Sequence, residues 1–222
     1  AIAVSQTLTV TPRGITVTAN SGQSKVYGNT DPNLSYTITN GSLVNSDVLT
    51  GSLTRVIGED AGLYAIEQGS LANANYQITF VSANFEITKA DQNISFSPLS
   101  NVVYGDSDFN LSATSDSGLA VSYTSSNTSV ASVSGNTVRI TGVGRTTITA
   151  QQSGNGNYKE AIAVSQTLTV TPRGITVTVN SGQSKVYGNT DPNLTYTITN
   201  GSLVNRDAVS YTHLTLPTIS CV

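Results

Sequence analysis

The chain of 222 residues has no Met and no Trp, a single Cys and a single His. These are Cys221 and His213, and both lie in the last fifteen residues, which break the pattern of the rest. Elsewhere, disulfides and metal sites of the Cys/His type are therefore excluded. No histidine is available there as a base for a serine nucleophile. We predict no enzyme, and we assign no catalytic residue, no cofactor-binding residue, no metal ligand and no cofactor.

Charge is also scarce. Charged residues make up 10% of the chain, and the net charge is −3. This composition provides no basic surface for nucleic acid or for anionic lipid. No apolar run approaches the ~18 residues that would mark a membrane-spanning helix. We therefore expect no nucleic-acid partner and no membrane insertion by this segment.

A long internal repeat is the main feature that is present. Residues Ala1–Asp47 recur at Ala161–Asp207 with three differences, which are Ala19/Val179, Ser35/Thr195 and Ser46/Arg206. Such fidelity is typical of a tandem array, in which modules supply length or surface. The first twelve residues match the end of a module, and no Met is present, so we expect the chain to be a fragment of a longer protein.

Each repeat contains two related modules. The Tyr-Gly motif at Tyr27 returns at Tyr104 and again at Tyr187. The spacing gives modules of roughly 80 residues, which is large enough for a single core. The predicted boundaries are 1–12 for the last strand of a preceding module, 13–90 and 91–172 for two complete modules, and 173–207 for a truncated copy of the first.

Residues 208–222 form a tail that departs abruptly from the repeat. The sequence Ala208–Val222 stands where the first copy would predict VLTGSLTRVIGEDAG. The tail resembles a translated adapter sequence, so we interpret it as an artefact of a different origin from the repeat.

Apolar residues alternate with polar ones through both modules, as in a strand with one buried face. Turn signals such as Asn40-Gly41 and Asn73-Ala74-Asn75 separate the runs. Short strands between frequent turns predict an all-β fold of tandem Ig-like β-sandwich modules. The alternating sets are Ile15, Val17 and Ala19; Leu34, Tyr36 and Ile38; Tyr76, Ile78 and Phe80; Phe85 and Ile87; Ile94 and Phe96; Val121 and Tyr123; Val138 and Ile140; and Ile148 and Ala150.

Particular motifs resemble known families. The first module is similar to the MBG domain, a mostly bacterial Ig-like module of the Tyr-Gly type. The second resembles a bacterial Ig-like domain of the group-2 kind. The first resemblance rests on Lys25-Val26-Tyr27-Gly28, Asp31-Pro32-Asn33-Leu34, Gly41-Ser42-Leu43-Val44, Gly62-Leu63-Tyr64-Ala65-Ile66, Asn75-Tyr76 and Phe85-Glu86-Ile87-Thr88-Lys89-Ala90. The second rests on Tyr123-Thr124-Ser125-Ser126-Asn127, Val130-Ala131-Ser132-Val133 and Gly142–Ala150.

These resemblances imply a secreted, extracellular protein of the bacterial cell surface with an adhesin-like organisation. We predict a stalk or spacer whose partners are neighbouring modules of the same chain. One alternative is a multivalent binding module for a glycan or a host surface protein. A second is an accessory segment of a larger extracellular enzyme.

A few polar residues could form sites. The loops at Asp31 and at Asp106 and Asp108 raise the question of calcium, but each offers fewer oxygen ligands than the six to eight that Ca²⁺ takes. We favour turns made by Asp, Asn and Pro. Glu59 and Asp60 are likewise interpreted as a solvated turn rather than an acid/base pair.

Aromatic, glycine and lysine residues complete the candidates. Tyr27 and Tyr104 are predicted to be rings packed over turns rather than ligand-stacking groups. Gly142-Val143-Gly144 lies between two strand patterns, so we reject a phosphate loop, which needs a helix to follow. For the lysines, we favour an exposed or edge-protecting position over an isopeptide cross-link. The lysines concerned are Lys25, Lys89, Lys159 and Lys185.

Overall fold

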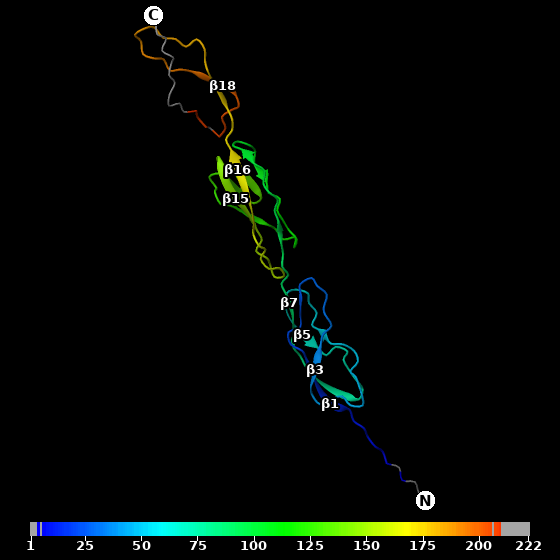
Figure 1. Ribbon diagram of the computed structural model, residues 1–222. Helices are drawn as coiled ribbons and strands as arrows, with labels where there is room; N and C mark the ends of the chain where they lie inside the picture. The colour runs from blue at the N-terminus through cyan, green and yellow to red at the C-terminus, as the bar shows by residue number, and fades with distance from the viewer. Residues whose placement is uncertain (1–3, 5, 206, 210–222) are drawn as a thin grey trace. The chain divides into compact units, whose positions relative to one another are not determined.

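The computed structural model describes residues 4, 6–205 and 207–209. Eighteen strands and no helix are assigned among these residues, so the predicted all-β class is confirmed. Within this described part there is accordingly no helix of the length and apolarity needed to cross a membrane. Figure 1 shows the strands along the chain.

The chain divides into two compact units. The first contains Ala1–Asn93, Ser115–Leu119 and Gln152–Ile162, and the second contains Ile94–Thr114, Ala120–Gln151 and Ala163–Val222. Each unit has its own hydrophobic core. The module boundaries expected from the repeat remain predictions, and the first unit also includes Ser115–Leu119 and Gln152–Ile162 from the second predicted module.

Two sheets form the first unit. The first has the order β3-β1-β6, with β1 antiparallel to β3 and parallel to β6. The second has the order β2-β7-β5-β4. The strands are β1 (Arg13–Ala19), β2 (Ser24–Val26), β3 (Tyr36–Asn40), β4 (Thr54–Arg55), β5 (Gly62–Glu67), β6 (Tyr76–Val81) and β7 (Asn84–Thr88).

Alternation in these strands places the apolar side chains between the two sheets. Ile15, Val17 and Ala19 of β1 are buried, and Phe85 and Ile87 of β7 lie in the same core cluster. Because both sheets contribute to one core, the unit is sandwich-like. Burial of apolar area at about 25 cal/mol per Å² stabilises this arrangement.

The second unit repeats the plan with other strands. One sheet has the order β12-β15-β16-β9 and another has β10-β14-β13. β8 pairs with β11, whose two residues are divided between the two units. The strands are β8 (Ile94–Ser95), β9 (Val102–Val103), β10 (Phe109–Asn110), β11 (Thr114–Ser115), β12 (Ser122–Ser125), β13 (Ala131–Ser134), β14 (Thr137–Ile140), β15 (Gly144–Gln151) and β16 (Val164–Thr171). Val138, Ile148 and Leu168 are central to its core.

The repeated sequence folds differently in its two copies. Residues 4 and 6–12 form no strand, and Leu8 is 87% exposed, whereas its copy Leu168 on β16 is 0% exposed. β16 lies between β15 and β9, which supply the neighbours that residues 6–12 lack. The same sequence therefore becomes a buried strand only where its partners are present.

The second copy of the first module is partly built among the described residues. β17 (Thr176–Val179) pairs with β18 (Tyr196–Asn200) in the register that joins β1 to β3, including the same bulge. Ile175 is exposed, whereas its copy Ile15 is buried. Pairing with β18 is thus encoded locally, while burial of the inner face requires the rest of a core.

Candidate functional site

Four charged side chains meet at one end of the first unit. Lys25 Nζ lies 2.6 Å from Asp31 Oδ1 and 2.5 Å from Glu59 Oε2. Arg55 Nε lies 2.6 Å from Asp31 Oδ2, and Arg55 Nη2 lies 2.7 Å from Glu59 Oε1. We call these four residues the charge cluster. In a chain with so little charge, two cations and two carboxylates in mutual contact are the most distinctive polar feature.

Lys25 faces inward because of its place on β2. This strand runs parallel to β7, with Lys25 opposite Ile87, and its burial pattern exposes both neighbours of Lys25. The Lys25 side chain is only 4% exposed. The expected exposed position is therefore wrong for Lys25, whereas its place on β2, the edge strand of the sheet, agrees with the edge-protecting alternative. Its ammonium group is buried with two carboxylates as partners, as a buried cation requires.

Arg55 is held by more than its ion pairs. Its side chain is 6% exposed, and Nη1 donates hydrogen bonds to the carbonyl oxygens of Gly58 at 2.5 Å and Val56 at 3.1 Å. Its Cζ also lies 5.1 Å from the ring centroid of Tyr64 and 5.4 Å from that of Phe85. A planar guanidinium can stack on rings and bind a carboxylate through two bonds at once. Arg55 therefore ties the turn after β4 to the core and to the Asp31 loop.

The ion pairs shift the protonation equilibria of the cluster. Hydrogen bonds from Arg55, then from Lys25, lower the pKa of Asp31 from 3.8 to about 2. Hydrogen bonds to Asp31 and Glu59 raise the pKa of Lys25 above 10.5. The charged forms are thus favoured throughout the neutral range. The cluster is an ion-pair network at any ordinary pH.

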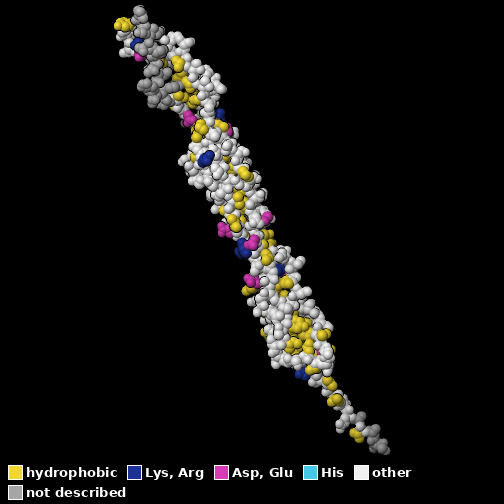
Figure 2. All heavy atoms as spheres, viewed as in Figure 1, with side chains coloured by type: hydrophobic (Ala, Val, Ile, Leu, Met, Phe, Trp, Pro, Cys, Tyr) yellow, Lys and Arg dark blue, Asp and Glu magenta, His cyan; other side chains and the backbone are white. Residues whose placement is uncertain are grey.

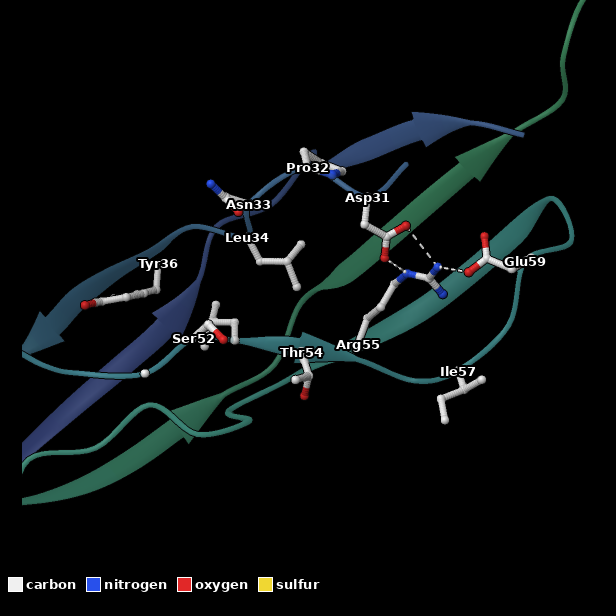
Figure 3. A pocket seen from close by; sticks show the side chains of 12 residues that line it. Asp31, Pro32, Asn33, Leu34, Tyr36, Ser52, Thr54, Arg55, Ile57 and Glu59 are labelled. Carbon is white, nitrogen blue, oxygen red and sulfur yellow. Dashed lines mark hydrogen bonds and ion pairs between the residues drawn. The ribbon is translucent and has the colours of Figure 1, made fainter. Parts of the chain in front are cut away.

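A surface hollow of about 600 Å³ lies beside the cluster. Its walls combine Asp31, Arg55 and Glu59 with Leu34, Tyr36 and the 98%-exposed Ile57. In Figure 3 Arg55 projects from β4, and Asp31 and Glu59 approach its guanidinium from two sides. The charged groups point at each other rather than at an open ligand position. The hollow is consequently bordered by polar groups that already have partners.

The acidic loops can now be placed. Asp31 faces the cations of the charge cluster. Asp106 Oδ2 accepts a hydrogen bond from the backbone N–H of Val103 at 2.8 Å, which closes its own turn. Among the described residues, no group of three or more acidic or metal-ligating side chains converges on a point. The Asp106 carboxylate thus closes its own turn, whereas the Asp31 carboxylate binds Lys25 and Arg55.

The pair Glu59 and Asp60 lies in the turn between β4 and β5, as expected for a turn. Glu59 is more than a solvated carboxylate, since it binds Lys25 and Arg55. Asp60 Oδ1 accepts a hydrogen bond from Asn157 Nδ2 at 2.8 Å. The two carboxylates therefore have different partners and do not form a pair of their own.

Lys25 contacts two carboxylates, Asp31 and Glu59, so it is the candidate lysine to compare with the isopeptide hypothesis. A Lys–Asn isopeptide bond assisted by such a carboxylate would need an Asn amide beside a neutral amine and a protonated carboxyl group, with ammonia as the leaving group. The raised pKa of Lys25 and the lowered pKa of Asp31 favour the opposite protonation states. The charge cluster is therefore set up as a salt bridge. Of the other candidates, Lys89 donates to the carbonyl oxygen of Asn155 at 2.7 Å, Lys159 lies 2.9 Å from Asp91, and Lys185 pairs with Asp191.

The two tyrosines of the Tyr-Gly motifs are half-buried at turns. Tyr27 lies edge-on to Tyr158, with centroids 5.4 Å apart and an interplanar angle of 74°. Tyr104 Oη lies 3.5 Å from Asp207 Oδ1. The segment Gly142–Gly144 leads from β14 into β15. A strand therefore follows it, whereas a phosphate loop needs a helix at that position.

Arg55 was missed by the sequence analysis. It precedes no motif and lies on a strand of only two residues. The available signal was compositional, because Arg55 and Glu59 bring charge into a region otherwise made of small polar residues.

A known protein family matches the part of the chain that contains the charge cluster. The family described as MBG domain (YGX type) matches residues 15–86 and 175–220, together just over half of the chain. The chain belongs to this family. The first match covers the charge cluster and the Tyr27-Gly28 turn, and the second covers the repeated copy. MBG domains are β-rich repeat modules, in agreement with the sandwich and the internal repeat.

The second match ends at residue 220, so it extends into the tail that the sequence analysis separated from the repeat. Most of that tail, including His213 and Cys221, lies outside the described residues. Its assignment to an artefact stays a prediction, as does the group-2 resemblance of the second module. No curated protein matches the chain.

Proposed function

We propose that this chain is a length of stalk or spacer from a secreted bacterial cell-surface protein of the adhesin-like kind. The observation that carries the proposal is the near-identical repetition of 47 residues 160 positions apart, between Ala1–Asp47 and Ala161–Asp207, which span the end of one module and the first part of the next. Repeated modules of constant sequence make reach proportional to their number. The extracellular location is supported by the family resemblance.

The polar groups of the first unit also support a structural role. Both cations of the charge cluster are nearly buried and fully engaged with Asp31 and Glu59. A binding site for a charged or hydroxylated ligand would instead present polar groups with free positions. The hollow beside the cluster therefore favours the spacer over the glycan- or host-binding alternative.

Short joints in the sequence support limited bending. The junction Lys89-Ala90-Asp91-Gln92 between the two predicted modules is not a long Gly/Ser linker. Because so few linker residues restrict the angles between neighbouring modules, the proposal is a chain of modules with limited bending.

Small-angle scattering of the full chain tests the proposal. A compact particle of this length would have a radius of gyration of about 17 Å. We expect a radius clearly above this value and a pair-distance distribution with a long tail. A compact, symmetric distribution would reject the spacer function. A glycan array probed with the same chain, with binding as the outcome, would favour the binding-module alternative.

A further inference from the structure

The two described Tyr-Gly turns in complete modules have the same backbone anchoring. The N–H of Tyr27 donates to the carbonyl oxygen of Thr88 at 2.8 Å, and the N–H of Tyr104 donates to that of Thr171 at 2.9 Å. Thr88 ends β7 and Thr171 ends β16. Each turn is therefore bonded to the last residue of a final strand, immediately before the chain leaves the module.

At the first turn, the departing chain and a later loop are held together. Ala90 forms a parallel bridge with Tyr158, and the N–H of Lys159 donates to the carbonyl oxygen of Ala90 at 2.9 Å. The ring of Tyr27 packs edge-on against Tyr158. An offset or edge-to-face aromatic pair of this kind adds to the area that it buries.

Polar contacts around the same loop reinforce this packing. Asn157 donates from Nδ2 to Asp60 Oδ1 at 2.8 Å and accepts at Oδ1 from the N–H of Ala61, also at 2.8 Å. Lys89 Nζ donates to the carbonyl oxygen of Asn155. The loop 152–162 is thus bound to the Tyr27 end by a ring contact at its centre and hydrogen bonds at its edge.

At the second turn, the departing chain again returns onto the Tyr-Gly motif. Arg173 Nε donates to the carbonyl oxygen of Tyr104 at 2.9 Å. Gly105 has φ +86°, and a Cβ there would lie 2.6 Å from Cγ2 of Val204. Glycine therefore allows Val204 to approach the turn directly, in addition to giving the turn its positive φ.

We propose that the Tyr-Gly turn is the docking element by which each module holds the segment that follows it in the array. The Tyr27-Gly28 turn binds the loop 152–162, which carries Tyr158. The Tyr104-Gly105 turn contacts the side chains of Arg173 and Val204 in the next repeat. The inference rests on the proposed tandem array, and it assigns to the motif a joint-forming role in place of the purely internal packing that the sequence predicted.

Hydrogen exchange of the full chain tests this role. Tyr27→Ala removes the ring pair, so amides of residues 155–159 should exchange roughly two- to tenfold faster, while β7 keeps its protection. Tyr27→Phe retains the ring and should match the unsubstituted chain. Tyr187→Ala is the matched control, because Tyr187 has the same neighbours as Tyr27 in the sequence but is fully exposed.

Two further variants complete the test. Tyr158→Ala should reproduce the effect of Tyr27→Ala, and the double variant should add little, because both remove one contact. Arg173→Ala should speed exchange in residues 176–179 and leave β15 unchanged.

Equal losses of protection in β7 and in residues 155–159 with Tyr27→Ala would show internal packing and overturn the proposal, as would no change in exchange at all. A compact scattering particle together with the expected changes in exchange would instead reject the spacer function alone.

Discussion

Arg55 binds both carboxylate oxygens of Asp31, through Nε at 2.6 Å and Nη2 at 3.0 Å. This two-point contact joins the loop after the Tyr27-Gly28 turn to β4, which the sequence separates by more than twenty residues. Replacement of Arg55 by Ala removes the cation that holds Asp31 and Glu59 in place beside Lys25. It also removes the donors to the Gly58 and Val56 carbonyl groups.

For Arg55→Ala we expect the free energy of unfolding of the first unit to fall by about 2–4 kcal/mol, below the maximum for a fully buried pair because Asp31 is partly exposed. Urea-dependent hydrogen exchange at β1 and β7 measures it. Arg13→Ala is the control, since Arg13 is exposed and should change stability little. A loss no larger than that of Arg13→Ala would contradict the structural role of the cluster.

Acid should weaken the first unit in a defined pH range. The pKa of Asp31 is lowered from 3.8 to about 2 in the folded chain, so its stabilising contribution is present above about pH 4 and is lost as the pH falls toward 2. The raised pKa of Lys25 adds a contribution that persists up to its unperturbed value of 10.5 and is lost only at higher pH. Thermal unfolding followed between pH 6 and 2 should show a steeper decline for the unsubstituted chain than for Asp31→Asn.

The repeat provides a matched pair for core truncation. Leu168→Ala opens a cavity in the second core and should cost about 2–5 kcal/mol, whereas Leu8→Ala changes an exposed side chain and should cost close to nothing. Both substitutions fall in the same local sequence, so intrinsic strand propensity cancels. Chemical denaturation of each variant provides the measurement, and similar losses would show that Leu8 is packed in solution.

Two features of position 51 require glycine: the backbone conformation and the closeness of neighbouring atoms. Its φ is +90°, and a Cβ would lie 2.2 Å from the carbonyl oxygen of Ser70. Gly51→Ala should therefore destabilise the first unit by about 2 kcal/mol or more. Gly22→Ala separates the two causes, because Gly22 also has positive φ but an added Cβ would have no atom within 4 Å. The comparison by thermal unfolding should give the smaller loss for Gly22→Ala.

Much of the fold could be predicted because burial follows alternation. Ile15, Val17 and Ala19 are inward on β1, and Ile148 and Ala150 are inward on β15, as the period-2 pattern indicated. Parallel pairing of β1 with β6 was beyond the reach of sequence patterns, since it joins strands about sixty residues apart and leaves no local mark.

The charge cluster shows where pattern alone is misleading. An apolar alternation would turn Val26 inward, yet Val26 is exposed and Lys25 is buried. The reason is tertiary: Asp31, from a loop, and Glu59, from a distant turn, supply the counter-charges that allow an ammonium group to be buried there. Neither partner is adjacent to Lys25 in the sequence, so the pairing becomes visible only after folding.

The separation of β1 from β17 by an intervening set of strands also bears on folding fidelity. Their sequences differ at one position, Ala19 against Val179, so either could in principle pair with the other's β3-type neighbour. Misassembly between adjacent like domains is a characteristic failure of repeat proteins. Interposing a core of different sequence keeps interchangeable strands apart along the nascent chain, so each hairpin meets its own partner first.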